Sequence, residues 1–232
     1  MVQFPQQRTK AHMHTPAFSA ADYDKKIRQT VPFYDAYFAQ AAAAVQGRFK
    51  KPVRWLDIGC GTGRMAEAAF GSVPLETFVF LDPSPQMLAA AKERFPFPCA
   101  QFLPLSAAEL PADGQFDVLT AMLVLHYFRE EERLRILRRC CAALAQGGVL
   151  IALHNVAPER EEELAQQKEE WRAFQLGQGK SPEETEAHLS RRGREFFSLP
   201  PATDLRLFMQ SGFRSAKVLR ASPFQAEYLA IK

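Results

Sequence analysis

Three glycines spaced by single residues follow an apolar segment in the first half of the chain, and their position indicates a ligand-binding turn. The segment Val53 to Ile58 is predicted to be a strand, and Gly59, Gly61 and Gly63 separate it from a helix-like stretch that begins at Arg64. Glycine has no Cβ, so it permits a tight turn, a positive φ and a close approach of the backbone to a ligand. Such a turn between a strand and a helix holds nucleotide-like ligands at the carboxyl end of a sheet. The pattern lacks the last spacing of the dinucleotide fingerprint G-x-G-x-x-G, which weakens the case for a nicotinamide-dependent dehydrogenase.

An aspartate stands where a ribose-binding acid is expected. A second apolar stretch, Phe78 to Leu81, ends in Asp82, which lies 19 residues after Gly63. An acidic residue at the end of the second strand, about 20 residues beyond the glycines, is typical of contact with a ribose diol. Alone, Asp82 would be interpreted as a turn or cap residue. Together with Asp57 and the glycines, it predicts a site for a nucleoside.

Four segments resemble, in this order, the motifs of the class I S-adenosylmethionine-dependent methyltransferases: LDIGCGTG, FLDPSPQML, FDVLTAMLVLHYF and GGVLIAL. They lie between about Val53 and Leu153, and the likeness continues more loosely to the C-terminus. The resemblance implies S-adenosyl-L-methionine as the cofactor and S-adenosyl-L-homocysteine as its product. It also implies a Rossmann-like sheet of seven strands, mostly parallel, in which the last strand is antiparallel.

The same resemblance implies roles for individual residues. In this family the first acid and the glycines contact the methionine half of the cofactor, and the acid after the second strand binds the ribose hydroxyls. Residues just after the second and third strands flank the adenine. Many relatives carry Asp where this chain has Ser106, so here the adenine amino group is expected to contact backbone groups. The expected cofactor-binding residues are Asp57, Gly59, Cys60, Gly61, Gly63, Asp82, Pro83, Ser84, Met87, Ser106, Ala107 and Ala121.

Hydrophobic patterning predicts the elements that position these residues. Strands alternating with helices indicate a doubly wound α/β fold, and near-continuous apolar segments fit strands buried on both faces. Gly147-Gly148 is expected to end a helix over 129–145 and to begin the fifth strand. A turn at Ala221-Ser222-Pro223 predicts that the last two strands are antiparallel. The expected strands are Val53–Ile58, Phe78–Leu81, Ala100–Leu103, Phe116–Ala121, Val149–Leu153, Phe213–Arg220 and Phe224–Ile231.

The length of 232 residues suits one α/β domain. We expect a polar, flexible tail over 1–16 and a single methyltransferase domain over 17–232. Within that domain, 17–47 is predicted to be a helical lid, and 155–204 a helical insertion on the substrate side, placed before the last strands.

Composition narrows the function classes. No apolar run approaches the roughly 18 residues of a membrane span, and the first 16 residues lack the core of a signal peptide, so we expect a cytoplasmic protein without a membrane partner. Net charge is +3 and the pI is about 8.7. This balance is mild for a nucleic-acid binder, so such a partner is not favoured, although tRNA stays open. The four cysteines lack metal-ligand spacing, and no metal is expected. We expect a monomer or a homodimer.

A sulfonium methyl is already activated, so catalysis needs mainly in-line positioning of a nucleophile. His126, just beyond the fourth strand, is the candidate base, and the alternative is a buried, hydrogen-bonded histidine. No Asn-Pro-Pro-Tyr sequence follows that strand, which argues against amino-methylation of nucleic-acid bases. The candidate substrate-contacting residues are Tyr23, Arg28, Tyr34, His154 and Asn155.

Three functions stay open. The compact size and the insertion favour methyl transfer to a small molecule. The run Val31-Pro32-Phe33-Tyr34-Asp35 is similar to the start of the carboxy-S-adenosylmethionine synthases of tRNA modification, which need an arginine for a carboxylate. Arg191, Arg192 and Arg194 are the candidates for that arginine. A non-catalytic S-adenosylmethionine-binding protein is the third alternative, and the intact cofactor motif counts against it.

Overall fold

The computed structural model describes residues 20–110 and 112–232. The predicted tail over 1–16 and the first residues of the predicted lid, 17–19, lie outside the described residues. Within the part that the structure describes, no helix is both long enough and apolar enough to span a membrane.

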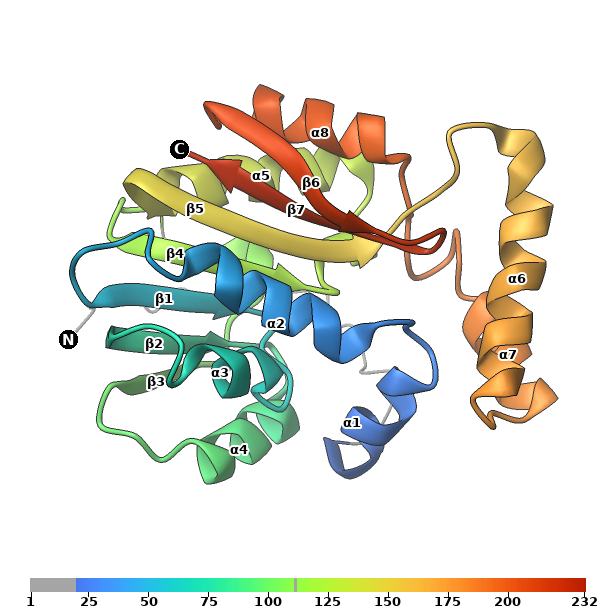
Figure 1. The fold of residues 1–232 in the computed structure, drawn as a ribbon, viewed down its shortest axis with the longest axis horizontal. Helices are drawn as coiled ribbons and strands as arrows, with labels where there is room; N and C mark the ends of the chain where they lie inside the picture. The colour runs from blue at the N-terminus through green and yellow to red at the C-terminus, as the bar shows by residue number, and fades with distance from the viewer. Residues whose placement is uncertain (1–19, 111) are drawn as a thin grey trace.

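Seven strands of the described chain form one twisted sheet in the order β3-β2-β1-β4-β5-β7-β6 (Figure 1). Neighbours among β1 to β5 pair in parallel, whereas β7 lies antiparallel to both β5 and β6. The predicted fold class, including the antiparallel last strand, is confirmed. The strand bounds are β1 Val53–Ile58, β2 Leu75–Leu81, β3 Ala100–Leu103, β4 Phe116–Met122, β5 Leu144–Asn155, β6 Ser215–Ala221 and β7 Gln225–Ile231.

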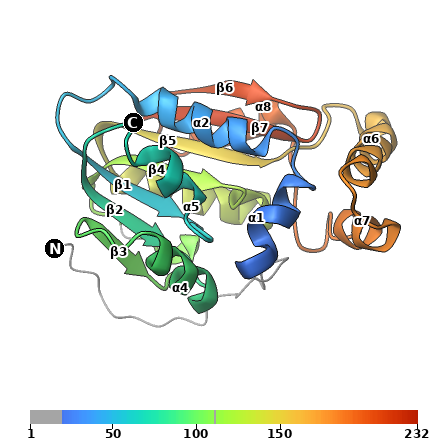
Figure 2. The same ribbon diagram turned by 60° about the horizontal axis from the view of Figure 1, so that its bottom comes forward.

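Helices cover both faces of the sheet (Figure 2). Buried side chains of α2, α3 and α4 form one core layer, and those of α5 and α8 form the other. The helices are α1 Ala20–Arg28, α2 Tyr34–Val45, α3 Arg64–Ala69, α4 Pro85–Arg94, α5 Glu130–Ala143, α6 Leu164–Gly177, α7 Pro182–Leu189 and α8 Pro201–Gln210. Short 3-10 turns stand at η1 Ala107–Glu109, η2 Leu125–Tyr127 and η3 Glu161–Glu163.

At the centre of the sheet, buried hydrogen bonds link the core to the edge that the carboxyl ends of the strands form. All seven residues of β4 are buried, as expected for a parallel strand covered on both faces. The indole Nε1 of Trp55 donates a hydrogen bond to Oγ1 of Thr120 at 3.0 Å, and this hydroxyl donates to Oδ1 of Asp57 at 2.7 Å. The strand order reverses between β1 and β4, which is where ligands bind in doubly wound folds.

The boundary between α5 and β5 differs from the prediction. The helix ends at Ala143 and β5 begins at Leu144, so Gly147 and Gly148 lie inside the strand. A Cβ on Gly148 would lie 2.9 Å from the carbonyl oxygen of Ala145, and Gly147 has a φ of 77°. Gly148 therefore serves close backbone packing and Gly147 a left-handed conformation within an irregular strand, and neither glycine stops the helix.

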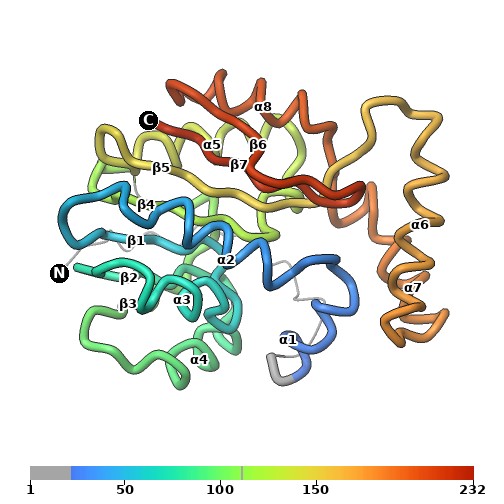
Figure 3. Tube along the Cα trace, viewed as in Figure 1, coloured from blue at the N-terminus to red at the C-terminus, as the bar shows by residue number. Residues whose placement is uncertain are grey.

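Between β5 and β6 the chain leaves the sheet, forms α6 and α7 beyond the carboxyl ends of the strands, and returns (Figure 3). This excursion contacts the segment that follows α1. The indole Nε1 of Trp171 donates to the carbonyl oxygen of Thr30 at 2.8 Å, and the side chain of Gln29 donates to the carbonyl of Gln178 at 2.9 Å. The α6–α7 excursion and the α1 segment thus meet over the edge of the sheet where ligands bind in this fold class.

Glu227 on β7 is fully buried, and its carboxylate oxygens have no hydrogen-bond partner among the described residues. Burial raises the pKa of this carboxyl from 4.5 to about 8, although the charge of Arg220 opposes the shift. Between these pH values the folded protein therefore binds more protons than the unfolded chain.

We expect the free energy of unfolding to fall as the pH rises from about 5 to 8, with Glu227 contributing a slope of up to about 1.4 kcal/mol per pH unit. Urea unfolding of the wild type and of Glu227→Gln at a series of pH values measures this slope. The variant should show a flatter dependence, and exposed Glu76→Gln on β2 should not. Parallel curves for all three proteins would contradict a protonated Glu227.

Candidate functional site

The glycine turn after β1 contains three positive φ angles, and its glycines are required for different reasons. A Cβ on Gly59 would lie 2.4 Å from Cγ2 of Val124, and one on Gly63 would lie 2.6 Å from the ring of Phe95. A Cβ on Gly61 would meet only the ring of Tyr23, at 4.0 Å. Gly59 and Gly63 are therefore explained by packing, whereas Gly61 borders open space on the side of the cavity described below.

Two buried aspartates flank this turn. Asp82 accepts hydrogen bonds from the backbone N–H of Gly61 at 2.9 Å and of Ser84 at 2.8 Å, so it joins the end of β2 to the turn. Burial raises the pKa of Asp82, although these two N–H groups oppose the shift. Burial also raises the pKa of Asp57 to about 7, with the charge of Asp82 acting in the same direction and the hydrogen bond from Thr120 opposing it. Carboxylates without a buried cationic partner favour a ligand that carries hydroxyl or ammonium donors.

The first cavity lies over the glycine turn. Its floor comes from the ends of β1 and β4, and its cover comes from α1 and α2. The lining residues are Tyr23, Tyr34, Phe38, Asp57, Gly59, Cys60, Gly61, Thr62, Arg64 and Met122.

The second cavity adjoins the first, because Tyr23 lines both and Met122 of the first is followed in the chain by Leu123 of the second. Its walls come from α1, the end of β4, α6 and the residues that follow α7. The lining residues are Tyr23, Ile27, Thr30, Val31, Leu123, His126, Tyr127, Asn155, Trp171, His188, Arg191 and Phe196.

His126 lines the second cavity, and its protonation state follows from its hydrogen bond. The backbone N–H of Asn155 donates to Nδ1 of His126 at 3.3 Å, so the neutral imidazole carries its proton on Nε2. Burial, and then nearby basic side chains that include Arg133 and Arg191, lower the pKa of His126 well below its usual value. A neutral Nε2–H tautomer donates hydrogen bonds, and to act as a base at Nε2 it would have to move its proton to Nδ1, where the Asn155 N–H already points.

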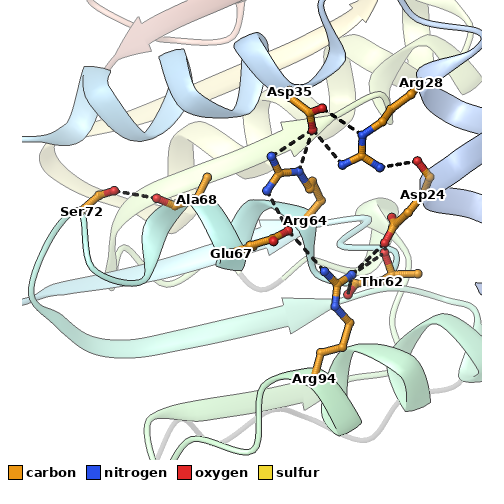
Figure 4. A network of polar contacts seen from close by, with 9 residues as sticks. All are labelled: Asp24, Arg28, Asp35, Thr62, Arg64, Glu67, Ala68, Ser72 and Arg94. Carbon is orange, nitrogen blue, oxygen red and sulfur yellow. Dashed lines mark hydrogen bonds and ion pairs between the residues drawn. The ribbon is translucent and has the colours of Figure 1, made fainter.

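Ion pairs attach the N-terminal helices to the glycine turn (Figure 4). Asp24 on α1 accepts from the hydroxyl of Thr62 at 2.9 Å and pairs with Arg94 at 3.0 Å. Arg28 pairs with Asp35 at 2.9 Å, and Asp35 also pairs with Arg64 at 3.0 Å. Exposed pairs of this kind each contribute about 0–1 kcal/mol, so the network holds α1 and α2 against the glycine turn only weakly.

Of the residues predicted to contact substrate, three line the cavities: Tyr23 and Asn155 border the second and Tyr34 the first. Arg28 is directed to Asp35 and lines neither cavity. His154 also lies apart, because side chains alternate along β5. Its Nε2 contacts Asp204 at 3.0 Å, its ring stacks on Tyr228, and Arg133 completes this buried group on the opposite face of the sheet.

The predicted adenine-side residues serve local structure around β2 and β3. Ser84 caps α4 by accepting from the N–H of Met87 at 3.4 Å, with Pro85 as the first residue of the helix. Ser106 forms a capping box with Glu109 before the buried Ala107. Ala121 packs into the core layer beneath α5 and α8, whereas the next residue, Met122, lines the first cavity. Pro83, directly after Asp82, is partly buried.

Several cavity residues were not singled out by the sequence. Thr30, Leu123, Tyr127 and His188 reach the second cavity from separate segments, so no local spacing indicates them. Leu123 has a φ of 62°, a strained conformation for a branched residue that directs the chain out of β4 and into η2. Trp171 and Phe196 also line the second cavity, and both belong to the segment predicted to be a helical insertion on the substrate side.

Comparison with known proteins agrees with this geometry. Residues 56–150 match the family model described as a methyltransferase domain. The chain is 29% identical over 117 residues to the malonyl-[acyl-carrier protein] O-methyltransferase of Haemophilus ducreyi, a match covering 49% of this chain and 44% of that protein. It is 26% identical over 203 residues to the carboxy-S-adenosyl-L-methionine synthase of Trichodesmium erythraeum, covering 82% and 77%. The match thus spans less than half of the first relative and most of the second.

A similar fold occurs in a solved S-adenosylmethionine-dependent methyltransferase of Leishmania major. The TM-score is 0.61 at 17% identity, and the alignment covers 90% of this chain and 82% of that one. Together with the methyltransferase domain matched over residues 56–150, these likenesses support a class I S-adenosylmethionine-dependent methyltransferase.

Proposed function

We propose that this protein binds S-adenosylmethionine in the first cavity and transfers its methyl group to a small organic acceptor in the second. One observation carries the proposal: the two cavities adjoin at the carboxyl ends of β1 and β4 and share Tyr23. Neighbouring donor and acceptor sites are what an in-line displacement requires. The net charge of +3 also suits a small-molecule acceptor better than a nucleic acid.

The residues of the first cavity fit this cofactor. Gly61 leaves space at the turn, Asp57 offers a buried carboxylate to an ammonium group, and Asp82 lies beside the turn for a ribose diol. When bound, the cofactor supplies a methyl group that its sulfonium has already activated. Arg64, which lines the cavity, is suited to the carboxylate of the amino-acid portion.

The remaining tasks fall to the lid and the insertion. Tyr23 of α1 lies between the two cavities, and Trp171 of α6 closes the second from the far side, so both exclude water from the reacting atoms. His126 presents an Nε2–H donor, which positions an acceptor oxygen but takes no proton from it. This arrangement favours a nucleophile that is already deprotonated at neutral pH.

Calorimetric titration with S-adenosylhomocysteine, together with mass spectrometry of any ligand released from the purified protein, tests the proposal. We expect micromolar binding at one site per chain. A folded protein that binds neither S-adenosylhomocysteine nor S-adenosylmethionine would refute it.

The affinity for S-adenosylhomocysteine should depend on pH through Asp57. Because the pKa of this carboxyl is about 7 in the unliganded protein, the charged form that attracts the ligand's ammonium group is lost below that value. We expect Kd to rise by up to about tenfold per pH unit below pH 7 and to level off above it. Calorimetry between pH 5.5 and 8.5 measures this, and Asp57→Asn should bind weakly with little pH dependence. An equally steep dependence in the variant would assign the titration to another group.

A second candidate function is synthesis of carboxy-S-adenosylmethionine, and the position of Arg191 favours it. Of the three arginines proposed from the sequence, Arg191 lines the second cavity, while Arg192 bonds to Gln167 and to the carbonyl of Val156 and Arg194 is exposed. Release of a carboxylated cofactor from the purified protein would support this candidate over methyl transfer.

A further inference from the structure

We propose that the acceptor is a flat, largely apolar compound with a carboxylate, and that Arg191 binds this carboxylate in the second cavity. The inference rests on the proposed function and names the class of acceptor for the same site. It follows from the shape of the cavity walls, from the charges that face the cavity and from the protonation of its histidines.

The walls of the second cavity are rings. Trp171 and His188 meet edge to face with centroids 4.9 Å apart, and His188 stacks on Phe196 at 5.8 Å. Phe196 also contacts His126 edge-on at 5.9 Å, and the ring of Tyr127 lies 4.5 Å from that of His126. These rings pack against one another and give the second cavity a partly aromatic wall, against which a planar molecule can lie.

The lining of the second cavity carries a positive charge, which comes from Arg191. Among the described lining residues, Arg191 is charged at neutral pH and no aspartate or glutamate is present. The side chain of Arg191 is only 16% exposed, and its Nε and Nη2 bond to Glu195 at 2.8 Å, on the outer side of the loop that follows α7. The ion pair with Glu195 orients the guanidinium group of Arg191. Because this group has five N–H donors in a planar fork, donors remain for a second carboxylate.

His126 and His188 are neutral, so they do not change the net charge that Arg191 gives to the lining of the cavity. Burial, followed by the charges of Lys180 and Arg191, lowers the pKa of His188 to about 3, and His126 is neutral for the reasons given above. The charge of Arg191 lowers the pKa of both imidazoles, and its partner Glu195 is not among the residues that line the cavity. His126 adds its Nε2–H as a second donor.

The charge of Arg191 and the N–H donors of Arg191 and His126 favour an anionic acceptor over an amine. A cationic acceptor would meet the like charge of Arg191 in a partly dehydrated site, where repulsion is strong. A carboxylate would accept from Arg191 with matching planar geometry. The loop is anchored for this role, because the N–H of Phe197 donates to the carbonyl of His126 at 2.6 Å and so fixes Arg191 and Phe196 relative to η2.

The test compares three probes of one shape: 4-hydroxybenzoate, its neutral amide 4-hydroxybenzamide, and the cationic 4-hydroxybenzylamine. Binding is measured by calorimetry on the full chain saturated with S-adenosylhomocysteine. We expect the acid to bind at least about tenfold more tightly than the amide, and the amine to bind most weakly. In Arg191→Gln the preference for the acid should disappear, while Arg194→Gln, an exposed arginine three residues away, should retain it.

The outcomes separate the inference from the function on which it rests. Equal binding of acid and amide, no binding of either, or an acid preference that survives Arg191→Gln would each overturn the inference, even with S-adenosylhomocysteine bound normally. Failure to bind S-adenosylhomocysteine would instead remove the proposed function, and the three probes would then be compared on the protein alone. A third outcome concerns the cofactor. It requires that carboxy-S-adenosylmethionine binds more tightly than S-adenosylmethionine, that Arg191→Gln loses this difference, and that the probes show no acid preference. This outcome would place the carboxylate on the cofactor and overturn the assignment to the acceptor.

Discussion

Replacing Gly61 by valine should abolish measurable binding of S-adenosylhomocysteine, a loss of at least about 100-fold in affinity. Gly61 has a φ of 54°, and a Cβ at this position would extend into the space beside Tyr23. A branched side chain would fill the approach of the ligand to the backbone of the turn, and it would strain a conformation that β-branched residues rarely adopt. Both effects act on the ligand-binding turn.

A matched control separates steric exclusion from general strain. Gly71 also has a positive φ, 89°, and nothing lies within 4 Å of a Cβ built there. Gly71→Val therefore introduces comparable backbone strain away from both cavities and should bind S-adenosylhomocysteine like the wild type. Thermal unfolding of both variants verifies that they are folded. Normal affinity in a folded Gly61→Val protein would refute the assignment of the first cavity to the cofactor.

Asp82→Ala should weaken S-adenosylhomocysteine binding by about 2–3 kcal/mol, which corresponds to about 30–150-fold in Kd. The expected loss has two parts. Charge-assisted hydrogen bonds to the ribose diol disappear, and the turn loses the carboxylate that accepts from the N–H of Gly61 and Ser84. The buried position of Asp82 makes each of these bonds stronger than a surface bond.

A double-mutant cycle on protein and ligand separates these two parts. The wild type should bind the 2′,3′-dideoxy analogue of S-adenosylhomocysteine much more weakly than the parent compound, whereas Asp82→Ala should bind both alike. Glu76→Ala, an exposed acid on the same strand, serves as the control and should change neither affinity. If the variant still distinguishes the two ligands fully, Asp82 supports the turn and does not bind the ribose.

The residues around the glycine turn and the first cavity could be predicted from the sequence because they lie close together in the chain. A parallel strand, a glycine turn and a helix form one local unit, so Asp57, Gly59 and Gly61 are placed by neighbours in sequence. The second strand pairs directly with the first, which brings Asp82 to the N–H of Gly61. The alternation of strands and helices followed from the apolar periodicity of each segment, whereas the seven-stranded sheet with an antiparallel last strand followed as much from the family resemblance.

The sequence by itself thus determined the alternation of strands and helices, the glycine turn and the acids beside it. Only the tertiary structure decided the second cavity. Its walls come from α1, η2, α6 and the loop after α7, and the contact between Trp171 and Thr30 joins residues 141 positions apart. Tertiary structure also decided that His154 contacts Asp204 and that His126 holds its proton on Nε2. Each depends on a partner brought close by folding, and no local pattern encodes a hydrogen bond between segments that are distant in the chain.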